Sequence, residues 1–288
     1  MRISDIFKKK TVFSFEVFPP KKTSSVDVIY KTLEEMRDLS PDFISVTYSA
    51  GGSGNGQLSC DIASKLKDEY GITPMIHLPC INYSREEISN VLEELKRRGI
   101  ENILALRGDI NPDIKPVKDF KYASELVEFI KSKGDFDVAG ACYPEGHNEA
   151  DSIVDDIRNL RTKVDAGAEH LISQLFFDNK FFYEFREKAA IAGINVPIEA
   201  GIMPVVNKNQ IERMVSMCGA SLPQKFAKMM QRYEHSPEAL RDAGIAYAVD
   251  QIVDLVANGV DGIHLYTMNN AFVARRISDA VSGIIGAK

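Results

Sequence analysis

The feature that most constrains the fold is an eightfold alternation of short apolar segments with longer segments of helical periodicity. The apolar segments are rich in β-branched or aromatic residues, which is typical of buried strands, and each is followed by a predicted helix. The predicted strands are Val12–Phe18, Phe43–Tyr48, Pro74–Pro79, Asn102–Leu106, Asp137–Tyr143, His170–Phe176, Pro197–Met203 and Gly262–Tyr266. The predicted helices are Val26–Leu39, Ser59–Tyr70, Arg85–Arg98, Tyr122–Lys133, Glu149–Gly167, Lys180–Ala192, Lys208–Met217 and Asn270–Ile285.

Eight such units could close into a barrel or form an open doubly wound sheet. Their number favours an α/β fold of the closed (β/α)8 TIM barrel type. An open dinucleotide-binding sheet would carry Gly-x-Gly-x-x-Gly after an early strand, and the glycine-dense stretch Gly51–Gly56 does not match it. A phosphate-binding P-loop is also excluded, because Gln57 and Leu58 follow where Lys and Ser/Thr are required. The segment Leu222–Asn258 predicts additional helices, broken at Ser236–Pro237, inserted before the eighth strand.

Length and charge narrow the functional classes. The barrel and its insertion account for nearly all of the 288 residues, so we expect residues 1–288 to form a single domain. A net charge of -6 argues against nucleic acid or an anionic membrane as a partner. The sequence has no apolar run long enough to span a membrane and no signal peptide, and its four cysteines are widely spaced. We therefore expect a reduced, cytoplasmic protein.

Polar residues gather where the predicted strands end. In a TIM barrel, functional side chains project from the carboxyl ends of the strands and from the loops that follow. The residues at these positions are Glu16, Thr47, His77, Arg107, Asp109, Tyr143, Glu145, His147, Gln174, Glu199 and Tyr266 to Asn270. A purely structural barrel end would need far fewer, so this end is the predicted functional site.

Glu16 is the sharpest candidate, because it interrupts the otherwise apolar strand ahead of Pro19 and Pro20. Burial is expected to raise the pKa of this carboxyl and to make it a proton donor near neutral pH. The alternative is a structural carboxylate that a buried arginine or a backbone amide satisfies.

Three other features each have a structural alternative. Asp109 could act in the site, or could cap a helix or pair with an arginine. Gln174 suits the edge of a heterocycle, but could instead bond the barrel backbone. Asp156, Asn159 and Lys163 share one helix face and could reach a ribose or pyrophosphate, whereas a solvated helix face is the commoner explanation.

Metal and nucleophile chemistry have little support. The five histidines form no His-x-His or His-Glu-x-x-His pair, which argues against a zinc or binuclear hydrolase. No Gly-x-Ser-x-Gly elbow occurs either. Of the histidines, His77 is the one expected to contact a cofactor.

Taken together, eight blocks in register resemble the methylenetetrahydrofolate reductase family over essentially the whole chain. The blocks are Phe15–Lys21, Ser45–Gly52, Leu104–Asp109, Tyr143–His147, Lys163–Ala168, Ser173–Phe177, Gly201–Val205 and His264–Asn269. The resemblance implies a barrel that holds FAD, takes electrons from NAD(P)H and reduces 5,10-methylenetetrahydrofolate to 5-methyltetrahydrofolate by a ping-pong mechanism. It also implies a role in one-carbon metabolism and methionine biosynthesis.

The resemblance also implies roles for individual residues. Glu16 matches the general acid that opens the folate imidazolidine ring to a 5-iminium cation, and Asp109 matches the carboxylate that stabilises this cation. Folate contacts are expected at Asp109, Gln174, Gln210 and Tyr266, although a capping role with Asn207 alone could account for Gln210. Cofactor contacts are expected at Thr47 (on the nicotinamide side, a role Gln174 could share), Tyr48, Ala50, His77, Arg107, Gly108, Asp109, Ala123, Tyr143, His147, Ala150, Asp156, Asn159 and Lys163.

Three positions depart from the family pattern: Thr162 at a basic flavin contact, Met214 at an aromatic that packs on substrate, and Asn270 at an arginine that meets folate. These departures bear on folate affinity and on the identity of the reductant. The resemblance suggests a homo-oligomer, and a partner protein for electron delivery is possible. Two other functions remain open at this point: a flavin- or folate-binding subunit of a larger reductase complex, and a flavin-free pterin-site methyltransferase barrel.

Overall fold

The computed structural model describes residues 1–20, 23–48, 56–109, 117, 119–207, 214–216 and 218–286. Eight parallel strands, each hydrogen-bonded to the next, close into a barrel in the order of the sequence, with β8 pairing β1. The strands are β1 (Val12–Val17), β2 (Phe43–Val46), β3 (Thr73–Pro79), β4 (Asn102–Leu106), β5 (Asp137–Cys142), β6 (His170–Ser173), β7 (Ile198–Ile202) and β8 (Gly262–Tyr266). The predicted fold class is therefore confirmed.

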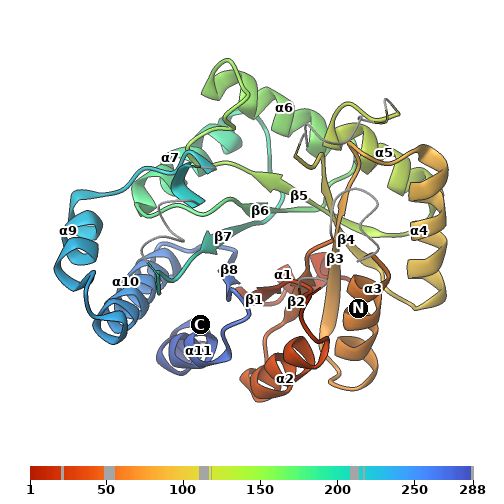
Figure 1. Ribbon diagram of the computed structural model, residues 1–288. Coiled ribbons are helices and arrows are strands. Elements are labelled where there is room, and N and C mark those ends of the chain that lie inside the picture. Colours follow the sequence, from red (N-terminus) through yellow and green to blue (C-terminus); the bar gives the residue numbers. More distant parts are fainter. Residues whose placement is uncertain are drawn as a thin grey trace.

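Helices surround the barrel (Figure 1). They are α1 (Ser4–Phe7), α2 (Asp27–Met36), the 3-10 turn η1 (Arg37–Leu39), α3 (Gly56–Asp68), α4 (Arg85–Arg97), α5 (Ala123–Lys133), α6 (Ile153–Asp165), α7 (Asn179–Ile191), α9 (Gln224–Tyr233), α10 (Pro237–Ala257) and α11 (Ala271–Ile285). The two helices predicted before the eighth strand are confirmed as α9 and α10, with Pro237 in the first turn of α10. None of the described helices is long and apolar enough to cross a membrane.

Several boundaries differ from the prediction, and two of them lie close to predicted site residues. Helix α6 begins at Ile153 rather than Glu149, because the Ser152 hydroxyl accepts the Asp155 N–H and caps the helix there. Strand β6 ends at Ser173, so Gln174 follows the strand rather than lying in it. Most of the helix predicted at Lys208–Met217 lies outside the described residues.

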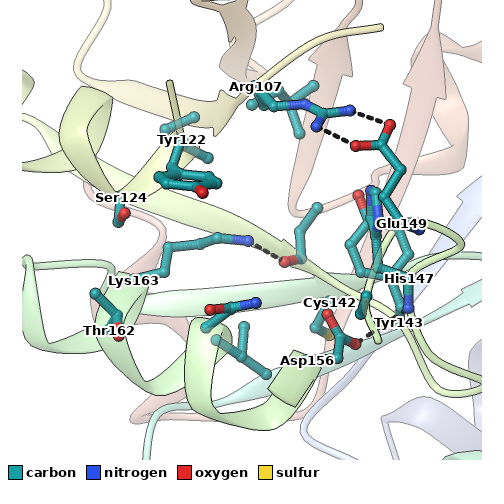
Figure 2. Close-up of a pocket in the computed structure, with 17 residues that line it drawn as sticks. Arg107, Tyr122, Ser124, Cys142, Tyr143, His147, Glu149, Asp156, Thr162 and Lys163 are labelled. Atoms are coloured by element: carbon teal, nitrogen blue, oxygen red, sulfur yellow. Dashed lines mark hydrogen bonds and ion pairs between the residues drawn. The ribbon is translucent and has the colours of Figure 1, made fainter. Parts of the chain in front are cut away.

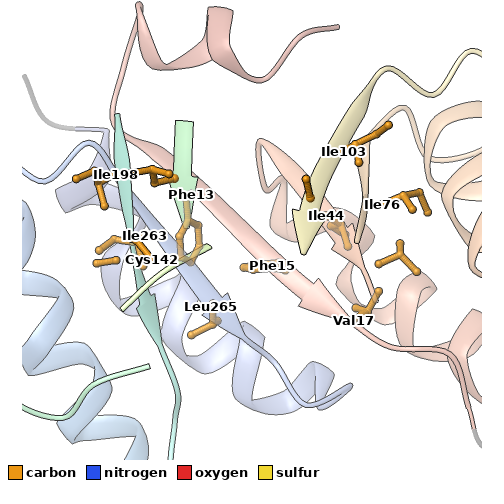
Figure 3. Close-up of a cluster of buried hydrophobic side chains, with 14 of the residues drawn as sticks. Phe13, Phe15, Val17, Ile44, Ile76, Ile103, Cys142, Ile198, Ile263 and Leu265 are labelled. Carbon is orange, nitrogen blue, oxygen red and sulfur yellow. The ribbon is translucent and has the colours of Figure 1, made fainter. Parts of the chain in front are cut away.

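The main core lies between the barrel and its helices. Alternate residues of each strand point outward, as Phe13, Phe15 and Val17 of β1 do, and pack with Ile263 and Leu265 of β8 in one large buried cluster (Figure 3). The residues between them, such as Ser14 and Glu16, point into the barrel.

The amino end of the barrel is closed by α1, which the sequence analysis did not predict. Ile3 and Ile6 pack against the inward-facing residues of the first layer, in a cluster with Val12 and Phe43. The backbone amide of Ile3 donates to Asn102 Oδ1 at 3.0 Å, which ties α1 to the strand ends. The cavities described below lie at the opposite, carboxyl end.

Candidate active site

Two adjoining cavities lie at the carboxyl end of the strands. The outer cavity, about 310 Å³, lies beside α5 and α6 (Figure 2). The central cavity, about 370 Å³, lies over the barrel mouth. Both share five wall residues: Leu106, Arg107, Ala141, Tyr143 and His147. The predicted functional end therefore carries a continuous, two-part site.

Glu16 lies in the central cavity between one histidine of β3 and one of β8. Its Oε2 is 3.7 Å from Nε2 of His77 on β3 and 3.8 Å from Nε2 of His264 on β8. Burial raises the pKa of Glu16, but the contacts with the two imidazoles outweigh burial and bring the pKa below its ordinary value. The expectation that burial gives Glu16 a raised pKa is thus wrong, because the histidines favour the charged form of this carboxyl.

His77 is a neutral imidazole at neutral pH. Burial lowers the pKa of His77 to about 4, more than the neighbouring Glu16 carboxylate can offset. It therefore acts on Glu16 as a polar neighbour rather than as a cation. Its Nε2 is buried and has no hydrogen-bond partner among the described residues, so this atom is available to a ligand in the central cavity.

Tyr266, the register partner of Glu16 on β8, and Gln174, which follows β6, also line the central cavity. The Tyr266 hydroxyl donates to the Ser173 carbonyl at 2.8 Å, and burial raises the pKa of this phenol well above its ordinary value. Gly201 leaves room for this contact, because a Cβ there would lie 2.8 Å from the Tyr266 ring. Gln174 Oε1 accepts the Leu175 N–H at 2.9 Å, which is the backbone role considered as its alternative, while the side chain still lines the cavity.

The helix face of Asp156, Asn159 and Lys163 lines the outer cavity rather than facing solvent alone. Lys163 Nζ donates to the Ala141 carbonyl at 2.6 Å, and burial lowers the pKa of this amine (Figure 2). Gly140 makes room for the lysine, since a Cβ there would lie 2.6 Å from Lys163 Cδ. Burial raises the pKa of Asp156, which accepts a backbone N–H at 3.3 Å. The face thus presents a largely buried amine to the cavity.

Arg107 stands where the two cavities meet. Its guanidinium donates to both carboxylate oxygens of Glu149, at 2.5 and 2.6 Å, and this bidentate contact lowers the pKa of Glu149 (Figure 2). The rings of Tyr143 and His147 lie 4.6 Å apart and perpendicular beside it. Arg107 is therefore paired with Glu149, and Asp109 adds a weaker electrostatic contribution that also raises the pKa of Arg107.

The other predicted residues divide into three groups. Ala123 and Ala150 line the outer cavity, and Thr47, Gly108 and Asp109 line the central one. Tyr48 lines neither of them: its ring lies 6.3 Å from that of Tyr83 and fills the space that a Cβ at Gly56 would need. Ala50 and Gln210 lie outside the described residues.

The three departures from the family pattern also have defined places. Thr162 lines the outer cavity and Met214 the central one. Asn270 caps α11 by accepting the Val273 N–H at 3.2 Å. No cluster of three metal-ligating side chains occurs among the residues that the structure describes.

Several lining residues were not predicted. Glu149, Tyr122 and Ser124 belong to the outer cavity, and apolar side chains form much of the central one: Leu104, Leu106, Ile172, Leu175, Met203 and Met268. Glu149 could have been found from its place two residues after His147. The apolar residues carry no sequence signal that separates a cavity wall from a core.

Comparisons with known proteins agree over nearly the whole chain. The model of the methylenetetrahydrofolate reductase family matches residues 2–282. The 5,10-methylenetetrahydrofolate reductase of Pectobacterium carotovorum subsp. carotovorum is 35% identical over 275 residues, which cover 96% of this chain and 90% of that protein. The Escherichia coli (strain K12) protein of the same name is 37% identical over 258 residues, covering 90% and 86%.

Among solved structures, an uncharacterized protein from Clostridium thermocellum that binds two copies of 5-methyl-5,6,7,8-tetrahydrofolic acid has the same fold. Its TM-score is 0.69 at 13% identity, with 97% of this chain and 96% of that chain covered.

Proposed function

The chain belongs to the methylenetetrahydrofolate reductase family, and from this premise we propose that it reduces 5,10-methylenetetrahydrofolate to 5-methyltetrahydrofolate with electrons that NAD(P)H supplies through FAD. The observation that carries the proposal is the two-part site. A cavity with a desolvated lysine adjoins a cavity in which a carboxyl group lies within 4 Å of two histidines.

The outer cavity suits the phosphate-bearing part of FAD. Lys163 and Arg107 supply cations for a pyrophosphate, and Asp156 and Asn159 supply groups that hydrogen-bond a ribose. Ala123 and Ala150 keep two of its walls small. In the central cavity, the unpaired His77 Nε2 is a buried polar atom that a flavin edge would satisfy. When bound, FAD supplies the hydride chemistry.

The central cavity suits the pterin. Glu16 would give its proton to the folate amine as the imidazolidine ring opens, and Asp109 would stabilise the cation that results. Gln174, Tyr266 and Gln210 are proposed to orient the pterin, and Tyr48 and Ala50 remain proposed flavin contacts by resemblance only. One cavity of about 370 Å³ would serve both the nicotinamide, beside Thr47, and the pterin. Successive occupation of this cavity is the basis for a ping-pong mechanism.

We further propose that residues 1–288 act as one catalytic domain, in a homo-oligomer in the cytoplasm. A partner protein could replace NAD(P)H as the direct electron donor. The folate product would then enter one-carbon metabolism and methionine biosynthesis.

A visible absorption spectrum tests the proposal. The purified protein is expected to show oxidised flavin bands, to lose them when NADH or NADPH is added without oxygen, and to regain them when methylenetetrahydrofolate follows. A colourless protein that binds no added FAD would contradict the flavin chemistry and favour the methyltransferase alternative. A yellow protein that neither nucleotide bleaches would point to electron delivery by another chain.

A further inference from the structure

A line of polar side chains leads from Glu16 down the inside of the barrel. His264 Nε2 faces Glu16 Oε2 at 3.8 Å, and the opposite ring nitrogen, Nδ1, lies 2.7 Å from Ser14 Oγ. The Ser14 hydroxyl in turn donates to Oε1 of Glu199 at 2.9 Å. Strands β1, β8 and β7, which are neighbours in the barrel, supply these residues. The line thus connects two carboxyl groups through a hydroxyl and an imidazole.

The lower part of this line is fully buried. Ser14, Glu199 and His264 are each 0% exposed, and neither Glu199 Oε2 nor His264 Nε2 has a hydrogen-bond partner among the described residues. Gly262 provides the space for Glu199, because a Cβ there would lie 2.7 Å from Glu199 Cγ. The His264 ring is held between Phe43, 6.1 Å away and stacked, and Tyr266, 5.3 Å away and perpendicular.

A buried carboxyl with one unpaired oxygen favours its protonated form. Burial raises the pKa of Glu199 to about 7, against the opposing effects of His264 and Ser14. The pKa of Glu16 lies below its ordinary value, so Glu199 is the carboxyl of this pair that keeps a proton to higher pH. The proposed acid of the folate step and the group that holds the proton are therefore different residues.

We propose that Glu199 is the proton store for Glu16, with Ser14 and His264 as the relay between them. When Glu199 is protonated, it donates to Ser14, Ser14 donates to His264 Nδ1, and the His264 Nε2–H points at the Glu16 carboxylate. This arrangement keeps Glu16 charged. When Glu199 is ionised, all three hydrogen bonds reverse and the bare Nε2 faces a protonated Glu16.

Conversion between these arrangements moves one proton and no electrons. The Glu199 O–H bond breaks as its proton forms a bond to Ser14 Oγ, and the Ser14 proton passes to His264 Nδ1. The Nε2–H bond then breaks as Glu16 Oε2 takes that proton. The last transfer requires the 3.8 Å separation to close to hydrogen-bond distance, which rotation of the partly exposed Glu16 side chain allows. Glu199 regains its proton by the reverse path through Glu16, whose side chain is the partly exposed end of the relay.

Other titratable groups face the relay. His77 of β3 contacts Glu16. His264 helps to lower the pKa of His170 on β6. Asp42 before β2 and Asp261 before β8 raise the pKa of Glu199. His77 and the two aspartates influence the pKa values of Glu16 and Glu199. The hydrogen-bonded path between the two carboxyl groups runs through Ser14 and His264.

The first test needs neither folate nor flavin, and so separates this proposal from the proposed function on which its catalytic use rests. Infrared difference spectra of the protein across a pH titration are expected to show a carboxylic-acid C=O band that disappears near pH 7. The band is expected to be absent in Glu199→Gln, to remain in Ser45→Ala, and to titrate at lower pH in Glu16→Gln, because a facing negative charge is gone. Absence of the band in the wild type, or a titration indifferent to Glu16→Gln, would overturn the proposal.

The second test is the pH dependence of single-turnover reoxidation of reduced enzyme by methylenetetrahydrofolate. In Glu199→Gln and in Ser14→Ala, reoxidation near neutral pH is expected to be slower by about tenfold or more, with recovery toward acid pH as solvent protonates Glu16 directly. Ser45→Ala is the matched control, since Ser45 Oγ is buried inside the same barrel and has no hydrogen-bond partner in the described part of the chain. Identical pH profiles for wild type, Glu199→Gln and Ser14→Ala would refute the relay. If either Glu199→Gln or Ser14→Ala fails to fold, the pH profile of the other variant still tests the relay.

Discussion

Replacement of Lys163 by methionine should weaken FAD binding without weakening the fold. Lys163 donates to the Ala141 carbonyl at 2.6 Å, and burial lowers the pKa of its amine. Loss of the amine removes a charge-assisted hydrogen bond but also removes the cost of desolvating a cation. Because these effects oppose each other, the free energy of unfolding of the flavin-free protein is expected to change by no more than about 1 kcal/mol.

The effect on FAD is larger, because methionine offers no cation to the pyrophosphate. A hydrogen bond to a charged group contributes about 1.5–3 kcal/mol, which corresponds to a rise in the Kd of roughly 10- to 150-fold. Fluorescence titration of flavin-free protein with FAD measures this Kd, and thermal unfolding of the same preparations measures stability.

Two further variants sharpen this test. Lys131→Met is the control, because Lys131 also donates to a backbone carbonyl, that of Phe136 at 3.0 Å, but lines neither cavity. Gly140→Ala keeps the Lys163 amine but should displace the lysine side chain, since the new Cβ would lie 2.6 Å from Lys163 Cδ. Weaker FAD binding is expected in Lys163→Met and Gly140→Ala only. A Kd for Lys163→Met within twofold of the wild-type value would refute the assignment of the outer cavity to the phosphates.

Three other perturbations follow from the same structure. Glu16→Gln is expected to slow reoxidation of the flavin by methylenetetrahydrofolate by about 10²–10⁴-fold. Flavin reduction by NADH should keep most of its rate, and stopped-flow absorbance would measure both half-reactions. Equal losses in both would contradict the role of Glu16 as the acid. Gly244→Ala is expected to destabilise the protein, because a Cβ there would lie 1.8 Å from the Val205 carbonyl oxygen and would push α10 outward; an unchanged urea midpoint would count against this packing. For Glu199, the folded-state pKa of about 7 lies above the ordinary carboxyl value, so its contribution to the free energy of unfolding declines as pH rises toward and through 7. Glu199→Gln should therefore gain on the wild type by about 1 kcal/mol between pH 6 and pH 8 in urea unfolding, and a constant difference would mean that Glu199 does not titrate there.

The barrel was predictable because each strand and helix has a hydrophobic pattern that is visible within a short stretch of sequence. Strands such as Asn102–Leu106 and Gly262–Tyr266 are bounded in the structure as predicted, since an apolar run followed by a helical period is visible within one segment. The short helix α1 was missed because it has only four residues and is held by tertiary contacts at the amino end of the barrel. Its own sequence carries almost no helical periodicity.

The location of the site was also predictable, because functional side chains of a TIM barrel lie at the carboxyl ends of the strands. These ends all lie on the same face of the barrel. The sequence did not show which side chains surround each titratable group of the site. The pKa of Glu16 depends on His77 and His264, which lie 61 and 248 positions further along the chain and reach Glu16 only when the barrel closes. Tyr48 stays a flavin contact proposed by resemblance, and its ring lies in the space that a Cβ at Gly56 would need.

The barrel interior also links stability to function. Inward positions of a TIM barrel are usually filled by branched aliphatic side chains. Here Ser14, Glu199 and His264 are inside the barrel and are fully buried, and Glu199 Oε2 and His264 Nε2 have no hydrogen-bond partner among the described residues. Unsatisfied buried polar groups destabilise a fold, so packing alone would favour their replacement by apolar residues. Their position beneath Glu16 offers a chemical reason for accepting this loss of stability. Burial raises the pKa of a carboxyl group, so a buried carboxyl keeps its proton to higher pH than an exposed one. An apolar replacement of Glu199 should therefore stabilise the protein and slow the folate step together.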